Sequence, residues 1–117
     1  MLAVPERLCS AGRRFVMSVD NELLLSAASA WEIAIKWGLK KLALPAHPEV
    51  LVPDWMERMG VTPLAVLPGH ALRVAALPPH HRDPFDRLLV AQAQIEEVPI
   101  LTADPVFAKY DVKVKRA

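Results

Sequence analysis

The chain of 117 residues is poor in cysteine, glycine and net charge: it has one cysteine, four glycines and a formal charge of +1. The single Cys9 cannot form an internal disulfide, so the sequence predicts a protein of the reducing cytoplasm. The glycines form neither a dinucleotide fingerprint nor a phosphate loop, and there is no Gly-x-Ser-x-Gly elbow. These absences argue against a nucleoside-triphosphate enzyme and a serine hydrolase.

Long hydrophobic runs are also lacking. The apolar stretch 23–31 is too short to cross a bilayer, and residues 1–14 carry charge where a secretory signal needs an apolar region. The sequence therefore predicts no membrane contact. The near-neutral charge neither indicates nor excludes a nucleic-acid partner, although residues 36–41 and 113–117 are locally basic.

Proline, in contrast, is frequent. Eleven prolines divide a chain that is 53% hydrophobic into short segments, which is typical of an α/β domain with tight loops. Helices are expected at 4–18, 29–40, 54–59 (with Pro53 at the first position), 69–77, 84–97 and 105–110. Strands are expected at 22–27, 61–66, 99–101 and 112–114. Alternating strands and helices predict a single domain, residues 1–117, around a largely parallel sheet with right-handed crossovers.

Three acids, Glu32, Asp86 and Asp104, lie where helices are expected to begin. Helix capping is one interpretation of all three. Ser29 and Glu32 have the spacing of a capping box, and Asp83 before Pro84 is a suitable cap for the helix whose first turn carries Asp86. Asp104 likewise precedes a proline. Each acid taken alone is therefore explained by helix initiation.

The three acids taken together favour a metal site. In a parallel sheet, the strand-to-helix junctions share one edge, and ligands bind in the crevice there. A cap contributes about 1 kcal/mol, whereas two carboxylates at about 4 Å repel by about 4 kcal/mol at an effective dielectric near 20. Acids that lie this close together would thus need a bound cation, or a raised pKa that keeps one of the carboxyl groups protonated. Oxygen ligands suit Mg²⁺ or Mn²⁺, and the matching chemistry is hydrolysis of a phosphodiester by a metal-activated water.

Histidines and tryptophans offer weaker alternatives. A zinc site is disfavoured by the spacing of its candidate ligands, which are His70, His80, His81 and Cys9. Residues 80–82 are instead interpreted as a solvated loop, with or without contact to RNA phosphates. The tryptophans could stack on bases, but core or dimer-surface positions are the more ordinary interpretation for Trp31 and Trp37; the third is Trp55.

Two segments carry a family resemblance. "LLLSAASAWEIAIKWGLKKLALP" (23–45), followed by "HHRDPFDRLLVAQAQIEEVPILTADPVFAKYDVKV" (80–114), resembles the PIN domain, and more closely the VapC-type toxins of bacterial toxin–antitoxin pairs. The most specific elements are Ser-x-x-Glu in "SAWEI", then "RDPFDRLLVAQA", and "LTAD" after a short strand. Their order and separation make the resemblance specific, and it covers most of the chain from Asn21 onward.

The resemblance implies an α/β/α sandwich and a Mg²⁺- or Mn²⁺-dependent endoribonuclease that is usually a homodimer and is neutralised by a cognate antitoxin. The family's metal-binding and catalytic acids correspond to Glu32, Asp86 and Asp104. Thr102 corresponds to a polar helper, and Asp83 to the cap of the helix that carries Asp86 or to an acid behind the ligands.

One element of the family pattern is not recognised in this sequence. Members begin with a central strand that ends in Asp-Thr or Asp-Ser and supplies a first acid, whereas residues 1–20 resemble what normally follows that strand. Asp20 is interpreted as a turn residue. The sequence thus predicts an N-terminally shortened PIN-like domain that lacks its first strand, with unpaired sheet edges and weakened metal binding. The alternative function is a catalytically silent module that retains antitoxin or dimer contacts.

Overall fold

A five-stranded, entirely parallel sheet in the order β3-β2-β1-β4-β5 lies at the centre of the computed structural model, which describes residues 2–3, 22–102 and 104–115. The strands are β1 Leu2–Ala3, β2 Leu24–Ser26, β3 Thr62–Leu64, β4 Ile100–Leu101 and β5 Val114–Lys115. The predicted α/β fold with a parallel sheet is confirmed. Pro63 is tolerated in β3 because β3 is an edge strand, where a missing N–H need not leave a ladder bond unmade.

The expectation that the first strand is missing is wrong. β1 occupies the central place in the sheet and pairs in parallel with β2 on one side and β4 on the other. It escaped recognition because its two residues are too short a run to show any hydrophobic period. The expected helix 4–18, the turn 18–21 and Asp20 lie outside the described residues.

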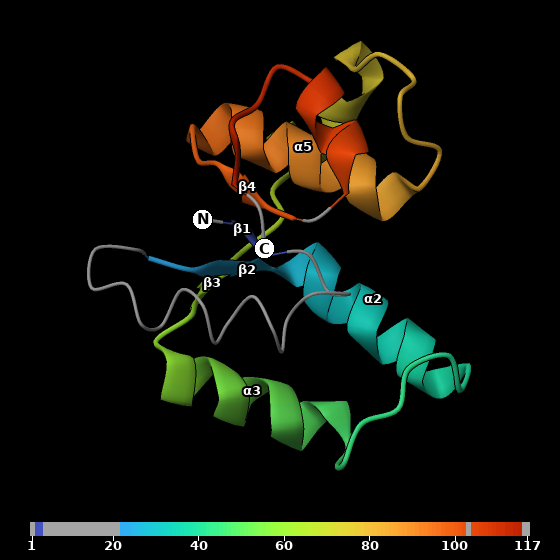
Figure 1. Ribbon diagram of the computed structural model, residues 1–117, viewed down its shortest axis with the longest axis vertical. Coiled ribbons are helices and arrows are strands. Elements are labelled where there is room, and N and C mark those ends of the chain that lie inside the picture. Colours follow the sequence, from blue (N-terminus) through green and yellow to red (C-terminus); the bar gives the residue numbers. More distant parts are fainter. Residues whose placement is uncertain (1, 4–21, 103, 116–117) are drawn as a thin grey trace.

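Helices cover both faces of the sheet, giving the predicted three-layer sandwich (Figure 1). Their bounds are α2 Ala27–Gly38, α3 Pro48–Met59, α4 Pro68–Arg73, the 3-10 turn η2 Val74–Ala76, α5 Pro84–Glu96 and the 3-10 helix η3 Pro105–Lys109. One apolar core lies between the sheet and α5, and includes Leu89, Val90 and Phe107. A second, smaller core lies between the sheet and α3, and includes Leu25 and Val61. None of the described helices is long and apolar enough to cross a membrane.

Two helix starts differ from the sequence-based prediction. Helix α2 is capped by Ser26, whose hydroxyl accepts the Ala28 N–H at 3.1 Å, and not by Ser29. Helix α3 begins at Pro48 and contains Pro53 in its interior, although Pro53 was expected at the first position. Both errors arise because two residues suited to starting a helix lie within a few positions of each other, and local chemistry does not distinguish between them.

The remaining elements follow the prediction with small shifts. The expected helix 69–77 is α4 continued by η2, and the segment 105–110 forms a 3-10 helix. Gly60 ends α3 in the left-handed region, with φ +66°, which a glycine adopts without strain. The final strand lies at Val114–Lys115 and thus begins two residues later than expected.

Candidate metal site at the carboxyl edge of the sheet

Helix α5 begins with a side-chain cap that orients its first turn. Asp83 Oδ1 accepts the N–H of Phe85 at 2.8 Å and that of Asp86 at 3.4 Å, and Pro84 occupies the first helical position. The predicted capping role of Asp83 is therefore confirmed. Asp86 lies in the first turn with a side chain that is 16% exposed. A carboxylate there benefits from the positive end of the helix dipole.

Asp104 follows β4 and is held by hydrogen bonds on both sides. The Thr102 hydroxyl accepts the Asp104 N–H at 3.1 Å, and Asp104 Oδ1 accepts the Val106 N–H at 2.9 Å, which caps η3. The bond from Val106 lowers the pKa of Asp104 below its usual 3.8; partial burial opposes the shift, and the nearby His81 adds to it. Thr102, which is buried, thus fixes the backbone of Asp104.

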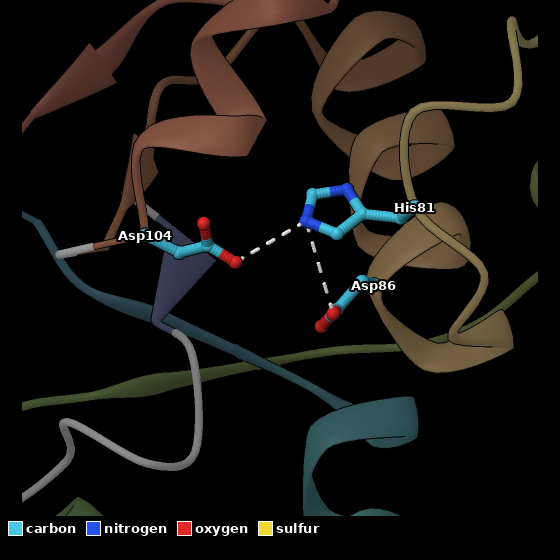
Figure 2. Close-up of side chains that lie close together, drawn as sticks. All are labelled: His81, Asp86 and Asp104. Atoms are coloured by element: carbon cyan, nitrogen blue, oxygen red, sulfur yellow. Dashed lines mark hydrogen bonds and ion pairs between the residues drawn. The ribbon is translucent and has the colours of Figure 1, made fainter.

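His81 lies between the two aspartates (Figure 2). Its Nε2 is 3.3 Å from Asp104 Oδ2 and 3.9 Å from Asp86 Oδ2. One ligand atom of each of these three residues lies within 4.8 Å of the others, and we call His81, Asp86 and Asp104 the ligand cluster. The structure therefore brings together two of the three acids singled out in the sequence, together with a histidine that was not assigned to the site.

The interpretation of His81 as part of a solvated loop is wrong. Its backbone N–H donates to the Tyr110 hydroxyl at 2.6 Å, and its ring stacks on Tyr110 at 5.5 Å and packs against Phe107 at 4.4 Å. Its Nδ1 is buried and has no hydrogen-bond partner among the described residues. His80 and Arg82, by contrast, are exposed as expected. The one signal in the sequence was that adjacent histidines point apart, which indicates that one of the pair turns inward.

Glu32 is buried on the inner face of α2, and its Oε2 is 3.4 Å from Lys36 Nζ. It does not close a capping box, because the first turn of α2 contains no acid. Among the described residues, Glu32 is not part of the ligand cluster. Its neighbour Trp31 nevertheless packs edge-on against Phe85 at 5.3 Å, so the start of α2 lies beside the first turn of α5.

A buried polar network joins α2 to α5. The Ser26 hydroxyl donates to Gln92 Oε1 at 2.5 Å, and Gln92 Nε2 donates to the Ala65 carbonyl at 3.2 Å. Ser26 and Gln92 are both fully buried. Because Ser26 also caps α2, this network ties the start of α2 to the middle of α5 and fixes how the two helices are placed.

The donor set of the ligand cluster fits a divalent cation. Two carboxylates and one imidazole nitrogen supply oxygen and nitrogen donors that lie within 4.8 Å of one another. Capping interactions hold both aspartates in place: the Asp86 N–H donates to Asp83 Oδ1, and Asp104 Oδ1 accepts the Val106 N–H. Neither interaction engages Asp86 Oδ2 or Asp104 Oδ2. The two carboxylates lie on either side of His81, and a bound ion would offset the repulsion between their charges.

A parallel α/β/α sandwich that gathers carboxylates where its strands end belongs to the class of α/β proteins that bind ligands in the crevice at the carboxyl edge of the sheet. Within that class, the chain matches the family model of the PIN domain over residues 5–113. The chain belongs to the PIN domain family.

Individual relatives support the same placement. A segment of the chain is 52% identical over 58 residues to "Ribonuclease VapC16" of Mycobacterium tuberculosis (strain ATCC 25618 / H37Rv), covering 50% of this chain and 41% of that protein. The match thus spans about two fifths of that relative's length. The solved structure described as "Structure of FitAB bound to IR36 DNA fragment" superposes with a TM-score of 0.63 at 18% identity, covering 99% of this chain and 94% of that chain. That likeness concerns the fold alone.

Proposed function

We propose that this protein is a metal-dependent endoribonuclease toxin of a toxin–antitoxin pair, built as one PIN-like domain over residues 1–117. The observation that carries the proposal is the meeting of His81, Asp86 and Asp104 at one point of the sheet edge. The family membership and the relative named as a ribonuclease supply the reaction class. The substrate is RNA, and the bond hydrolysed is a phosphodiester.

In this proposal, Asp86 and Asp104 would hold the ion, and Glu32 would contribute a third carboxylate from the neighbouring helix. Bound there, a divalent ion would lower the pKa of a water molecule and stabilise the charge on the leaving oxygen. Asp83 orients the helical turn that carries Asp86, and Thr102 orients Asp104. The lowered pKa of Asp104 favours its ionised form further, and an ionised carboxylate releases no proton when it binds a cation.

The metal is Mg²⁺ or Mn²⁺. Carboxylate oxygens accept either ion, whereas an imidazole nitrogen is a poor ligand for Mg²⁺ and a better one for Mn²⁺. If His81 Nε2 binds the ion, cleavage should be faster with Mn²⁺ than with Mg²⁺, and His81→Ala should reduce that ratio. An equal ratio in the two proteins would exclude His81 from the ligands and leave the carboxylates as the metal site.

A cytoplasmic homodimer covered by a cognate antitoxin completes the proposal. Several large apolar side chains are more than half exposed, and side chains of this kind suit contacts with a partner chain: Trp31, Leu39, Val50, Leu67 and Leu72. Trp31 is the most informative of them, because it packs on Phe85 beside the ligand cluster. A partner chain bound over Trp31 would lie next to the proposed active site.

The decisive experiment measures cleavage of total RNA by the purified protein with Mn²⁺ or Mg²⁺. Asp86→Asn should lose at least about 100-fold in rate, because it removes one charged ligand of a small carboxylate site. Asp111→Asn, an exposed acid after η3, is the matched control and should cleave like wild type. Equal cleavage by wild type and Asp86→Asn would reject the assigned role, and absence of cleavage in wild type would favour the silent binding module.

A further inference from the structure

The outer end of α2 carries a basic and aromatic surface that the proposed metal site does not use. We call Lys36, Trp37, Lys40 and Lys41 the α2 end surface. The Lys40 N–H donates to the Trp37 carbonyl at 3.1 Å, and the Lys41 N–H donates to the Lys36 carbonyl at 2.8 Å. Lys40 has φ +59°, so the chain turns sharply here. Lys40 and Lys41 are both exposed beside the helix end.

A cavity of about 420 Å³ opens at this turn. It is lined by Trp37, Gly38, Lys40, Leu42, Ala43 and Leu44. The Trp37 ring packs against the His47 ring at 4.6 Å, which steadies the indole, and a side chain at Gly38 would project into open space. Among the described residues, the lining therefore offers an aromatic wall, a small residue and one cation, with no carboxylate. A volume within the range of ordinary small-molecule sites is sufficient for one nucleotide.

Electrostatics favour an anion at this end in spite of the helix dipole. A bare helix C-terminus carries about half a negative charge, but the carbonyls of Lys36 and Trp37 are capped by the N–H groups of the turn. Two exposed lysines outweigh the remaining partial charge. Lys36 is two-thirds buried and lies between this end and Glu32, with its Nζ 3.4 Å from the Glu32 carboxylate.

The position of α2 connects this surface to the ligand cluster. The helix starts beside the first turn of α5, which carries Asp86, and extends outward from the sheet (Figures 1 and 2). About 9 Å of helix axis separates Glu32 from Gly38 at 1.5 Å per residue. That length corresponds to roughly three nucleotides of a stacked strand. A strand with its reactive phosphate beside Glu32, the third carboxylate of the proposed metal site, could therefore reach the cavity.

We propose that the α2 end surface is a subsite for single-stranded RNA: a base flanking the cleaved bond stacks on Trp37 in the cavity, and backbone phosphates contact Lys40 and Lys41. This rests on the proposed ribonuclease function and adds the place where the strand is held. Aromatic stacking with nearby lysines is the general way in which proteins bind unpaired strands without reading their sequence. The described residues that line the cavity include a lysine and no acid, which favours a phosphate chain over a basic peptide.

The test is an RNA-binding assay that requires no cleavage. Fluorescence anisotropy follows a labelled pool of random single-stranded RNAs, about 12 nucleotides long, binding to full-length Asp86→Asn protein in chelator over a series of salt concentrations. In this background, Lys40→Ala/Lys41→Ala should weaken binding and lower the slope of log affinity against log salt by about 1.4, at about 0.7 per phosphate contact. Lys113→Ala/Lys115→Ala, two exposed lysines at β5, is the control and should change the slope by less than one contact.

The aromatic part of the proposal has its own variants. Trp37→Ala should weaken RNA binding by about 5- to 150-fold, the range found for loss of one stacked base, and Trp37→Phe should retain most of the affinity. With active protein, the same changes should raise KM and leave kcat nearly unchanged, since they remove binding that is equal in the ground and transition states.

The subsite would be overturned if the lysine variant and Trp37→Ala both kept the RNA affinity and the salt slope of the Asp86→Asn background. This holds even if these variants lose binding to a protein partner. Equal loss in Trp37→Phe and Trp37→Ala would overturn the stacking assignment. Binding is measured separately from cleavage, so a wild type that binds RNA at this surface without cutting it would refute the ribonuclease function and leave the subsite standing.

Discussion

Replacing Gln92 by methionine should show how strongly the buried network between α2 and α5 contributes to stability. Methionine has a similar shape, so the change removes two hydrogen bonds and leaves little cavity. The Ser26 hydroxyl proton then loses its partner at a fully buried position, whereas the Ala65 carbonyl belongs to an exposed residue and can bond to water instead. One buried group left unsatisfied costs about 1–3 kcal/mol, so we expect the free energy of unfolding to fall by about 1–3 kcal/mol.

The assay is equilibrium denaturation in urea, with thermal unfolding as a second measure. At about 4 °C per kcal/mol for a domain of this size, Tm should fall by about 4–12 °C. Ser26→Ala should also destabilise the protein, partly because it removes the cap of α2. That capping loss occurs with either residue at position 92, so it cancels in a double-mutant cycle.

The cycle isolates the bond between Ser26 and Gln92. A coupling energy of about 1 kcal/mol or more is expected for two groups in direct contact at a buried site. If the double variant shows the sum of the two single effects within about 0.5 kcal/mol, the hydroxyl–amide bond does not hold α2 against α5, and the reasoning is refuted.

Three further predictions concern other parts of the molecule. Tyr110→Phe should lower the free energy of unfolding by about 1–3 kcal/mol, because the His81 N–H loses its acceptor; a urea midpoint equal to that of wild type would contradict the buried bond. Pro53→Ala should raise the free energy of unfolding by about 2 kcal/mol. A proline inside a helix costs about 3 kcal/mol, and its restriction of the unfolded chain offsets less than about 1 kcal/mol of that cost. A lower Tm for the variant would show that contacts of the proline ring stabilise the folded protein. In chelator, the pKa of Asp104, measured by NMR, should lie below 3.8. The ionised form of Asp104 stabilises the protein above that pH. When the pH falls through the pKa of the folded protein, the free energy of unfolding of wild type should therefore fall relative to that of Asp104→Asn. A rise of this difference on acidification would refute the assignment.

The sequence was sufficient to predict the fold where patterns were long or strongly marked. Helix α5 carries a cap, a proline and a continuous apolar face, and its prediction from 84 to 97 matches the structure to within one residue. The central strand β1 could not be recognised, because two residues contain no period. The start of α2 was misplaced because Ser26 and Ser29 are equally good caps locally, and burial in the sheet decided between them.

The site was predictable to the extent that it follows from topology. Asp86 and Asp104 meet because a helix start and a strand end lie at the same edge of a parallel sheet. His81 was not predictable, because its place depends on the stacking of its ring on Tyr110, a contact that joins residues far apart in the chain. The assignment of Glu32 as a third ligand remains a proposal, and a Glu32→Gln variant assayed for metal affinity tests it.

The separation of the two apolar cores has a practical consequence for redesign. Neighbouring residues on β4 serve different faces: Ile100 belongs to the core under α5 and Leu101 to the core over α3. All members of the ligand cluster lie in the part of the chain that packs with α5. The α3 layer could therefore be repacked to make a more robust protein without changing the ligand cluster, as long as the residues of α3 that contact α2, the helix of Glu32, are kept.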